Sequence, residues 1–169
     1  MIVVLSVEDV LSEPGVPLSA AGPTLFGRRL YTTLHNSGES LCLISHSQNR
    51  DLVREWLLRE GFSDYVKLVT RDDTDQPPDL WKVDQVRALV AHGQHIMYFV
   101  DHDPVVVPAM AEIGVPVMLV VHPWGDPGRQ FADAEVVYRS WDSLVDTIET
   151  ESLKRAEIRR KRRETTGEA

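Results

Sequence analysis

Residues 96–121, which read IMYFVDHDPVVVPAMAEIGVPVMLVV, contain two apolar runs separated by a short amphipathic segment. The runs 96–100 and 115–121 are nearly continuous in apolar residues, as is typical of strands covered on both faces of a sheet. The segment 104–114 has the length of a short helix. A strand, a helix and a second strand in this order are typical of parallel pairing with a right-handed crossover. This stretch therefore predicts an α/β fold.

The same alternation extends over the rest of the chain. Further strands are expected at 2–6, 41–45 and 66–70, with a weaker one at 135–138, and helices at 23–38, 49–62, 79–93 and 140–163. Asp79 and Ser140 are expected N-caps, and Gly61 and Gly93 are placed to end their helices. We predict one doubly wound, mostly parallel sheet over residues 1–150 and a long C-terminal helix with a basic tail at 151–169.

Composition restricts the class of protein. The 169 residues suffice for one domain with a real core, and no apolar run approaches the roughly 18 residues of a membrane span. The opening sequence lacks the basic start and the long apolar run of a signal peptide, and a single cysteine, Cys42, excludes an internal disulfide framework. We therefore expect a cytoplasmic protein with no membrane association, in which Cys42 is a small buried apolar residue.

Charge is divided unevenly along the chain. The net charge is −8, but residues 151–169 carry seven Lys or Arg and four Glu, which leaves 11 basic and 22 acidic side chains in residues 1–150. The acidic body is expected to repel nucleic acid, whereas the tail has the composition for a weak contact with a phosphate backbone. The alternative is a solvated helix end whose cations suit the negative pole of the helix dipole.

Polar residues follow the predicted strands, at the edge where ligands of such folds bind. Ser6, Glu8 and Asp9 follow the first strand, Ser45 and His46 the second, and Asp101, His102 and Asp103 the fourth, with Lys82 near the start of a helix. Asp103 is equally well placed to cap a helix beginning at Pro104. His46, His102 and His122 would also lie near this edge and offer a transition metal three imidazoles, although they lack a ligand-spacing motif.

At these positions the chain resembles the haloacid dehalogenase-like (HAD-like) superfamily of phosphohydrolases over roughly residues 1–148. The stretch VVLSVEDVL resembles its opening motif, LCLISHS its strand ending in Ser or Thr, WKVDQVRAL its lysine segment, and YFVDHDPVVVPAMAEIGVPVMLV its closing acidic motif. The resemblance implies the strand order 5-4-1-2-3. It also implies an open site without a cap domain, because the stretches that would hold one are too short.

The resemblance assigns a role to each of these residues. The family uses one Asp as nucleophile and a second as general acid/base, Ser or Thr and Lys to hold phosphate, and an acid to help bind Mg²⁺. Ser45 and Lys82 match the phosphate-binding positions. Ser6 stands at the nucleophile position and Glu8 at the acid/base position, and His102 falls on an acidic position between Asp101 and Asp103. A serine without an activating base is a poor nucleophile, and it brings no charge to Mg²⁺.

Two functions follow from these departures. The first is a HAD-like protein that has lost phosphatase activity and serves as a binding or regulatory protein, with anion binding left to Ser45 and Lys82. The alternative is a Mg²⁺-dependent phosphohydrolase with a reassigned site, in which Glu8, Asp101 and Asp103 hold the metal and water attacks. An open site would suit an unidentified protein partner or a large phosphorylated substrate.

The large aromatic residues have separate expectations. Trp56 and Trp81 are expected to pack helices on the sheet, and Trp124 lies in a loop near the site edge. Apart from the resemblance, Lys82 has the pattern of an exposed helix residue.

Overall fold

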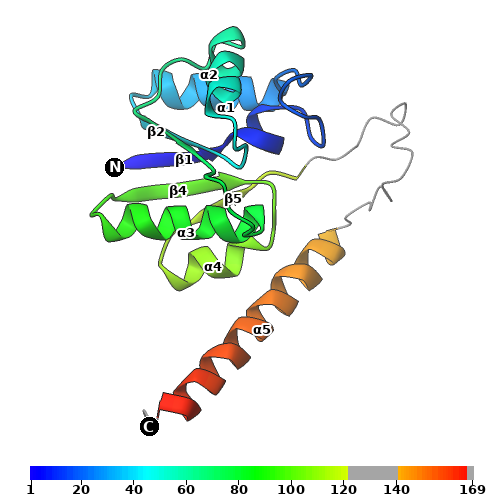
Figure 1. Cartoon of the computed structure of the whole chain (residues 1–169), viewed down its shortest axis with the longest axis vertical. Helices are drawn as coiled ribbons and strands as arrows, with labels where there is room; N and C mark the ends of the chain where they lie inside the picture. Colours follow the sequence, from blue (N-terminus) through cyan, green and yellow to red (C-terminus); the bar gives the residue numbers. More distant parts are fainter. Residues whose placement is uncertain (122–140, 167–169) are drawn as a thin grey trace.

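The computed structural model describes residues 1–121 and 141–166, in which five strands alternate with helices (Figure 1). The strands are β1 (Ile2–Ser6), β2 (Ser40–Ser45), β3 (Lys67–Thr70), β4 (Ile96–Asp101) and β5 (Val117–Leu119). The helices are α1 (Leu25–Asn36), α2 (Arg50–Arg59), α3 (Pro78–Ala91), α4 (Val106–Glu112) and α5 (Trp141–Thr166). All strand pairs are parallel in the order β3-β2-β1-β4-β5, so the predicted fold class and strand order are confirmed.

Two apolar layers cover the two faces of the sheet. Successive residues of a strand point to opposite faces, so Val3 and Leu5 of β1 pack with α1 and α2, while Ile2 and Val4 pack with α3 and α4. Both faces of the central strands are thus covered, which explains why these strands read as continuous apolar runs.

The predicted core aromatic residues are buried. Trp56 on α2 is 1% exposed and stacks on Phe62, with its indole Nε1 donating to the Ala21 carbonyl at 2.9 Å. Trp81 lies in the opposite layer at 3% exposure. Cys42 is buried in β2, as expected.

The predicted helix ends at Gly61 and Gly93 are confirmed, whereas the predicted N-cap Asp79 is wrong. Gly61 and Gly93 follow the ends of α2 and α3 with φ of 81° and 78°, a conformation that glycine adopts without strain. Asp79 is not an N-cap, because α3 begins one residue earlier with Pro78, whose fixed φ suits the first helical turn. Asp103 accepts from the Val105 N–H at 3.0 Å in a turn, and α4 begins only at Val106.

A single tight turn, η1 (Val7–Leu11), connects β1 to the segment that leads into α1. Asp9 in this turn has φ of 61°, which a short polar side chain tolerates better than most others. Gly27 allows α1 to approach the turn closely, since an added Cβ would lie 2.6 Å from the Val10 carbonyl oxygen. Ser12 and Pro23 then form an isolated antiparallel bridge that closes the loop between them.

Helix α5 lies against α4 and extends obliquely from the sheet (Figure 1). It is continuous across residues 150 and 151, so residues 151–166 of the basic tail belong to the same helix as residues 141–150. Among the described residues, no helix is both long enough and apolar enough to cross a membrane. The expected strand at 135–138, the cap Ser140, His122 and Trp124 lie outside the described residues.

Candidate functional site

The parallel topology brings most of the predicted site residues to one edge of the sheet. Strand β1 lies between β2 and β4, and Ser6, Ser45 and Asp101 are the last residues of these three strands. Glu8 follows in η1, and Lys82 reaches the same edge from α3. The five residues are at most 7% exposed, so the site is a buried polar cluster.

Ser6 stands at the predicted nucleophile position with its hydroxyl buried. Its residue is 0% exposed, and Oγ has no hydrogen-bond partner among the described residues. A serine becomes a strong nucleophile when a base accepts its proton, and such a base must lie within hydrogen-bond distance. Among the described residues, no base is hydrogen-bonded to the Ser6 hydroxyl.

Glu8 is held by the end of β2. The Ser45 hydroxyl donates to Glu8 Oε1 at 2.5 Å, and the His46 backbone N–H donates to Oε2 at 3.2 Å. His46 Nδ1 also lies 3.6 Å from Oε2. The predicted phosphate-binding hydroxyl is therefore engaged with the carboxylate at the predicted acid/base position.

Lys82 forms a buried ion pair with Asp101. The distance from Lys82 Nζ to Asp101 Oδ2 is 2.9 Å, and the two residues are 2% and 0% exposed. The expectation of an exposed helix residue was wrong because α3 packs this part of its surface on the sheet end. A buried ammonium requires a counter-charge, and the second carboxylate oxygen of Asp101 accepts the Asp103 N–H at 2.9 Å.

His102 links two carboxylates at the surface of the cluster. Its Nε2 lies 3.4 Å from Asp9 Oδ2 and its Nδ1 lies 3.3 Å from Asp101 Oδ1, the latter without hydrogen-bond geometry. Asp9 Oδ1 in turn accepts the Gly15 N–H at 2.7 Å, which fixes the loop after η1. Sequence reasoning noted His46 and His102 as possible metal ligands but missed their pairing with Glu8, Asp9 and Asp101. The adjacent acid and imidazole residues at two strand ends were the available signal.

The local electrostatics stabilise the charged form of Asp101. Burial alone would raise the pKa of Asp101, but the Lys82 ammonium, His102 and the Asp103 N–H outweigh it, and the pKa lies well below its usual range. Burial lowers the pKa of His46, and the nearby Glu8 carboxylate opposes this shift only in part. The cluster thus holds an ionised Asp101 and favours a neutral His46 near pH 7.

The arrangement does not fit the predicted Mg²⁺ site of Glu8, Asp101 and Asp103. Glu8 accepts from Ser45 and His46, Asp101 is paired with Lys82, and Asp103 caps the turn before α4. Across residues 1–121 and the described part of α5, no group of three or more His, Cys, Asp or Glu side chains is placed to hold a metal ion. Mg²⁺ prefers several free carboxylate or water oxygens, and these carboxylates are used elsewhere.

A cavity of about 370 Å³ opens beside the cluster. Its lining comprises Glu8, Asp9, the loop residues 15–19, His46, Ser47 and Leu52 of α2. The loop between Ser12 and Pro23 and the chain between β2 and α3 contain no inserted domain. Glu8 and Asp9 are the carboxylates among the residues that line this cavity.

No family model and no curated protein matches the chain. Solved structures with a similar fold include a chain of the Pnkp1/Rnl/Hen1 RNA repair complex, with 18% sequence identity and a TM-score of 0.62 over 74% of this chain. A chain from a second structure of a Pnkp1/Rnl/Hen1 complex has 17% identity and a TM-score of 0.59 over 72%. This chain spans less than half of each, 43% and 46% of their lengths. At such low identity the likeness concerns the α/β fold.

Proposed function

We propose that this chain is a HAD-like protein that has lost phosphohydrolase activity and serves as a binding or regulatory protein. The observation that carries the proposal is the buried Ser6 hydroxyl, which occupies the nucleophile position without a hydrogen-bonded base. Loss of an activated nucleophile costs several orders of magnitude in rate, and the remaining groups do not replace it.

The neighbouring contacts support the same proposal. Phosphate would need the Ser45 hydroxyl and the Lys82 charge, but Ser45 donates to Glu8 and Lys82 is paired with Asp101. An incoming anion would have to displace a carboxylate from one of them, so we expect weak orthophosphate binding. A partner that covers the open edge is then a protein or a large phosphorylated molecule, and the solved chains of similar fold from a multi-protein complex agree with a protein partner.

The test compares phosphate release from a generic aryl phosphate, with and without Mg²⁺, by wild type, Ser6→Ala and Ser6→Asp. We expect wild type and Ser6→Ala to be equally inactive. Activity confined to Ser6→Asp would place the loss at the nucleophile alone. Wild-type turnover at an ordinary enzymatic rate that Ser6→Ala abolishes would overturn the proposal, and this comparison holds even if the buried carboxylate of Ser6→Asp prevents folding.

Orthophosphate binding gives a second readout at the same site. Glu8→Gln removes a negative charge and weakens the hold on the Ser45 hydroxyl, so phosphate affinity measured by calorimetry should rise, by about tenfold. Glu13→Gln, which lies outside the cluster on the loop after η1, is the matched control and should leave the affinity unchanged. An equal rise in both variants would show that only overall charge matters.

The alternative of a Mg²⁺-dependent hydrolase requires Glu8, Asp101 and Asp103 to leave their present partners. Its signature would be Mg²⁺-dependent turnover in wild type that is lost in Glu8→Gln and Asp101→Asn.

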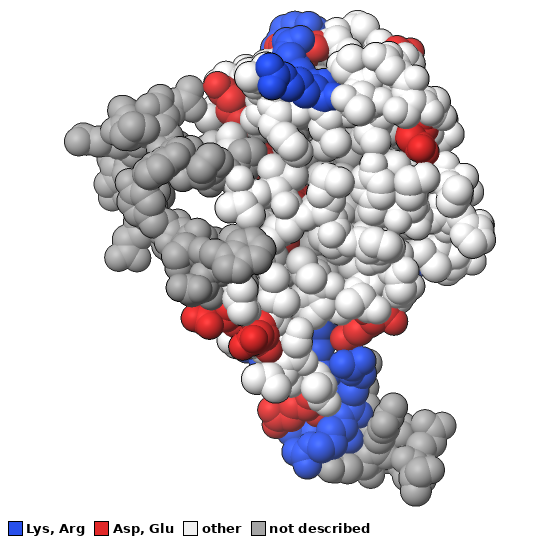
Figure 2. Space-filling view, turned by 180° about the vertical axis from the view of Figure 1, so that it is seen from behind, with Lys and Arg blue, Asp and Glu red and all other residues white. Residues whose placement is uncertain are grey.

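The proposal of a nucleic-acid contact through the basic tail is separate from both. Both cations and acids lie along α5 (Figure 2), and Lys154 and Lys161 pair with Glu151 and Glu157 at 2.7 and 2.8 Å. If deleting residues 151–169 leaves salt-dependent binding to RNA unchanged, that contact is excluded.

A further inference from the structure

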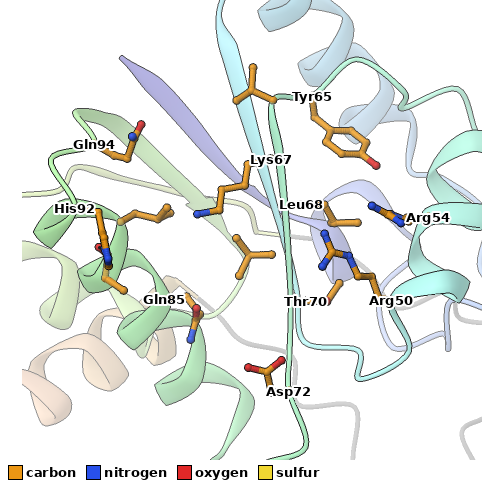
Figure 3. A pocket seen from close by; sticks show the side chains of 14 residues that line it. Arg50, Arg54, Tyr65, Lys67, Leu68, Thr70, Asp72, Gln85, His92 and Gln94 are labelled. Atoms are coloured by element: carbon orange, nitrogen blue, oxygen red, sulfur yellow. The ribbon is translucent and has the colours of Figure 1, made fainter.

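A groove runs along the outer edge of β3, away from the cluster at the strand ends. Its volume is about 700 Å³, and its floor includes Leu68 and Val69 of β3 and Leu89 of α3. Tyr65 lies at the end where the chain enters β3, and Asp72 at the end where it leaves (Figure 3). The groove therefore lies between α2 and α3 and follows the direction of the strand.

Positive charge lines both sides of this groove. Arg50 and Arg54 extend from α2 toward β3, while the Lys67 ammonium points to the other side, toward the helix that carries His92 (Figure 3). All three cations are exposed, and within the described residues none forms an ion pair. Asp72 is the carboxylate that lines the groove beside them. In a chain of net charge −8, this concentration of unpaired cations favours an anionic ligand.

The main chain of β3 adds a second kind of recognition. β3 is at the end of the sheet order and pairs with β2, and no other described strand covers its outer edge. An edge strand presents both N–H donors and carbonyl acceptors, which another extended polypeptide can satisfy. The exposed Val66, at 67% exposure, precedes this edge and adds an apolar contact.

We propose that the groove binds an acidic polypeptide segment in extended conformation, which pairs with the edge of β3 as a sixth strand. Alternate side chains of such a segment point to opposite faces, so acidic residues at every second position lie on one face and meet Arg50 and Arg54, while Lys67 on the other side of the groove adds to the attraction. The carbonyl oxygens of the edge disfavour a phosphodiester backbone, which has no donor for them. A second copy of the chain would bring two cationic grooves together, and like charges disfavour that pairing.

The probe is a fluorescein-labelled octapeptide of alternating Glu and Thr, titrated with the full chain and followed by fluorescence anisotropy. Two further peptides carry N-methyl groups on every second residue, one in each register, so that one of them loses the donors facing β3. A single-stranded oligouridylate of eight nucleotides tests nucleic acid. Arg54→Glu tests the groove, and Arg29→Glu, an exposed arginine on α1, is the charge-matched control.

We expect saturable binding of the acidic peptide, with an affinity about tenfold lower for Arg54→Glu and changed less than about twofold by Arg29→Glu. One of the two N-methylated peptides should bind about tenfold more weakly. Equal affinity of both N-methylated peptides, no saturable binding, or tighter binding of the oligouridylate would overturn the proposal. The N-methyl comparison uses unaltered protein, so it does not depend on the folding of a variant. The proposal is also independent of the phosphatase assays, which probe Ser6.

Discussion

The carboxyl end of the sheet and the outer edge of β3 both carry positive side chains, but these differ in burial and in ion pairing. At the carboxyl end the Lys82 ammonium is buried against the Asp101 carboxylate. Along β3, Arg50, Arg54 and Lys67 are exposed and form no ion pair with a described residue. The cation of the cluster is neutralised by a carboxylate of the chain itself, whereas the cations of the groove can pair with a ligand.

The comparison teaches that position in the fold does not by itself identify the binding surface. At the edge where ligands of parallel α/β folds bind, Lys82 and Ser45 are already engaged by carboxylates of the chain itself. A buried pair of this kind contributes little net stability, but breaking it leaves a buried charge without a partner. We therefore expect substitutions at the cluster to affect folding and those at the groove to affect binding.

The largest expected effect is that of Lys82→Met. It leaves the Asp101 carboxylate buried without its cation, and we expect a loss of about 3–5 kcal/mol in the free energy of unfolding. Combining it with Asp101→Asn removes the charge as well and should recover most of this loss. Chemical denaturation of the two single variants and the double variant gives the coupling. Additive effects would show that the ion pair is not the main contact of Lys82.

The second prediction concerns the loss of stability of wild type and of the double variant at acid pH. The pKa of Asp101 is lower in the folded chain than in the unfolded one, so the unfolded state binds more protons as the pH falls. The stabilisation is fully present above the unfolded pKa of about 4 and is lost as the pH drops toward the folded pKa. Wild type should therefore lose stability below about pH 4 more steeply than Lys82→Met/Asp101→Asn. Parallel curves of unfolding free energy against pH would contradict this assignment.

A smaller effect is expected from Gly27→Ala. The new methyl group would lie 2.6 Å from the Val10 carbonyl oxygen and 2.7 Å from Leu11 Cα, so α1 and the turn η1 must separate. We expect the free energy of unfolding, measured by thermal or chemical denaturation, to fall by about 1–3 kcal/mol. Thr32→Ala, at an exposed position of the same helix, should change stability by less than about 0.5 kcal/mol. Because Gly27 lies near the start of α1 and no residue of that helix lines the groove, peptide binding in the groove should persist. A parallel loss of that binding would show that the two regions are coupled.

The fold was predictable because the central strands are covered on both faces. Continuous apolar runs such as residues 2–6 and 96–100 identify buried parallel strands without reference to their neighbours. The helix ends marked by Gly61 and Gly93 were predictable for a local reason, the positive φ that follows a helix. The start of α3 was misplaced because Pro78 and Asp79 both suit a helix N-terminus, and the sequence does not rank them.

The site was predictable only as a set of residues. The topology requires Ser6, Ser45 and Asp101 to meet, because they end neighbouring parallel strands. Which groups pair was not predictable, since the Lys82 to Asp101 and Ser45 to Glu8 contacts depend on how deeply α3 and η1 pack. The groove of β3 could not be predicted from the sequence either, because Arg50, Arg54 and Lys67 lie in elements that only the tertiary structure brings together.

Cys42 sits in β2 beside the central strand, fully buried, and burial raises the pKa of its thiol to about 11. Near neutral pH the sulfur is therefore both protonated and shielded, and an alkylating reagent can reach it only when β2 separates from its surroundings. The rate of its alkylation then measures how often the sheet opens transiently. One natural thiol thus allows the variants above to be ranked by how often the core exposes itself, without any added label.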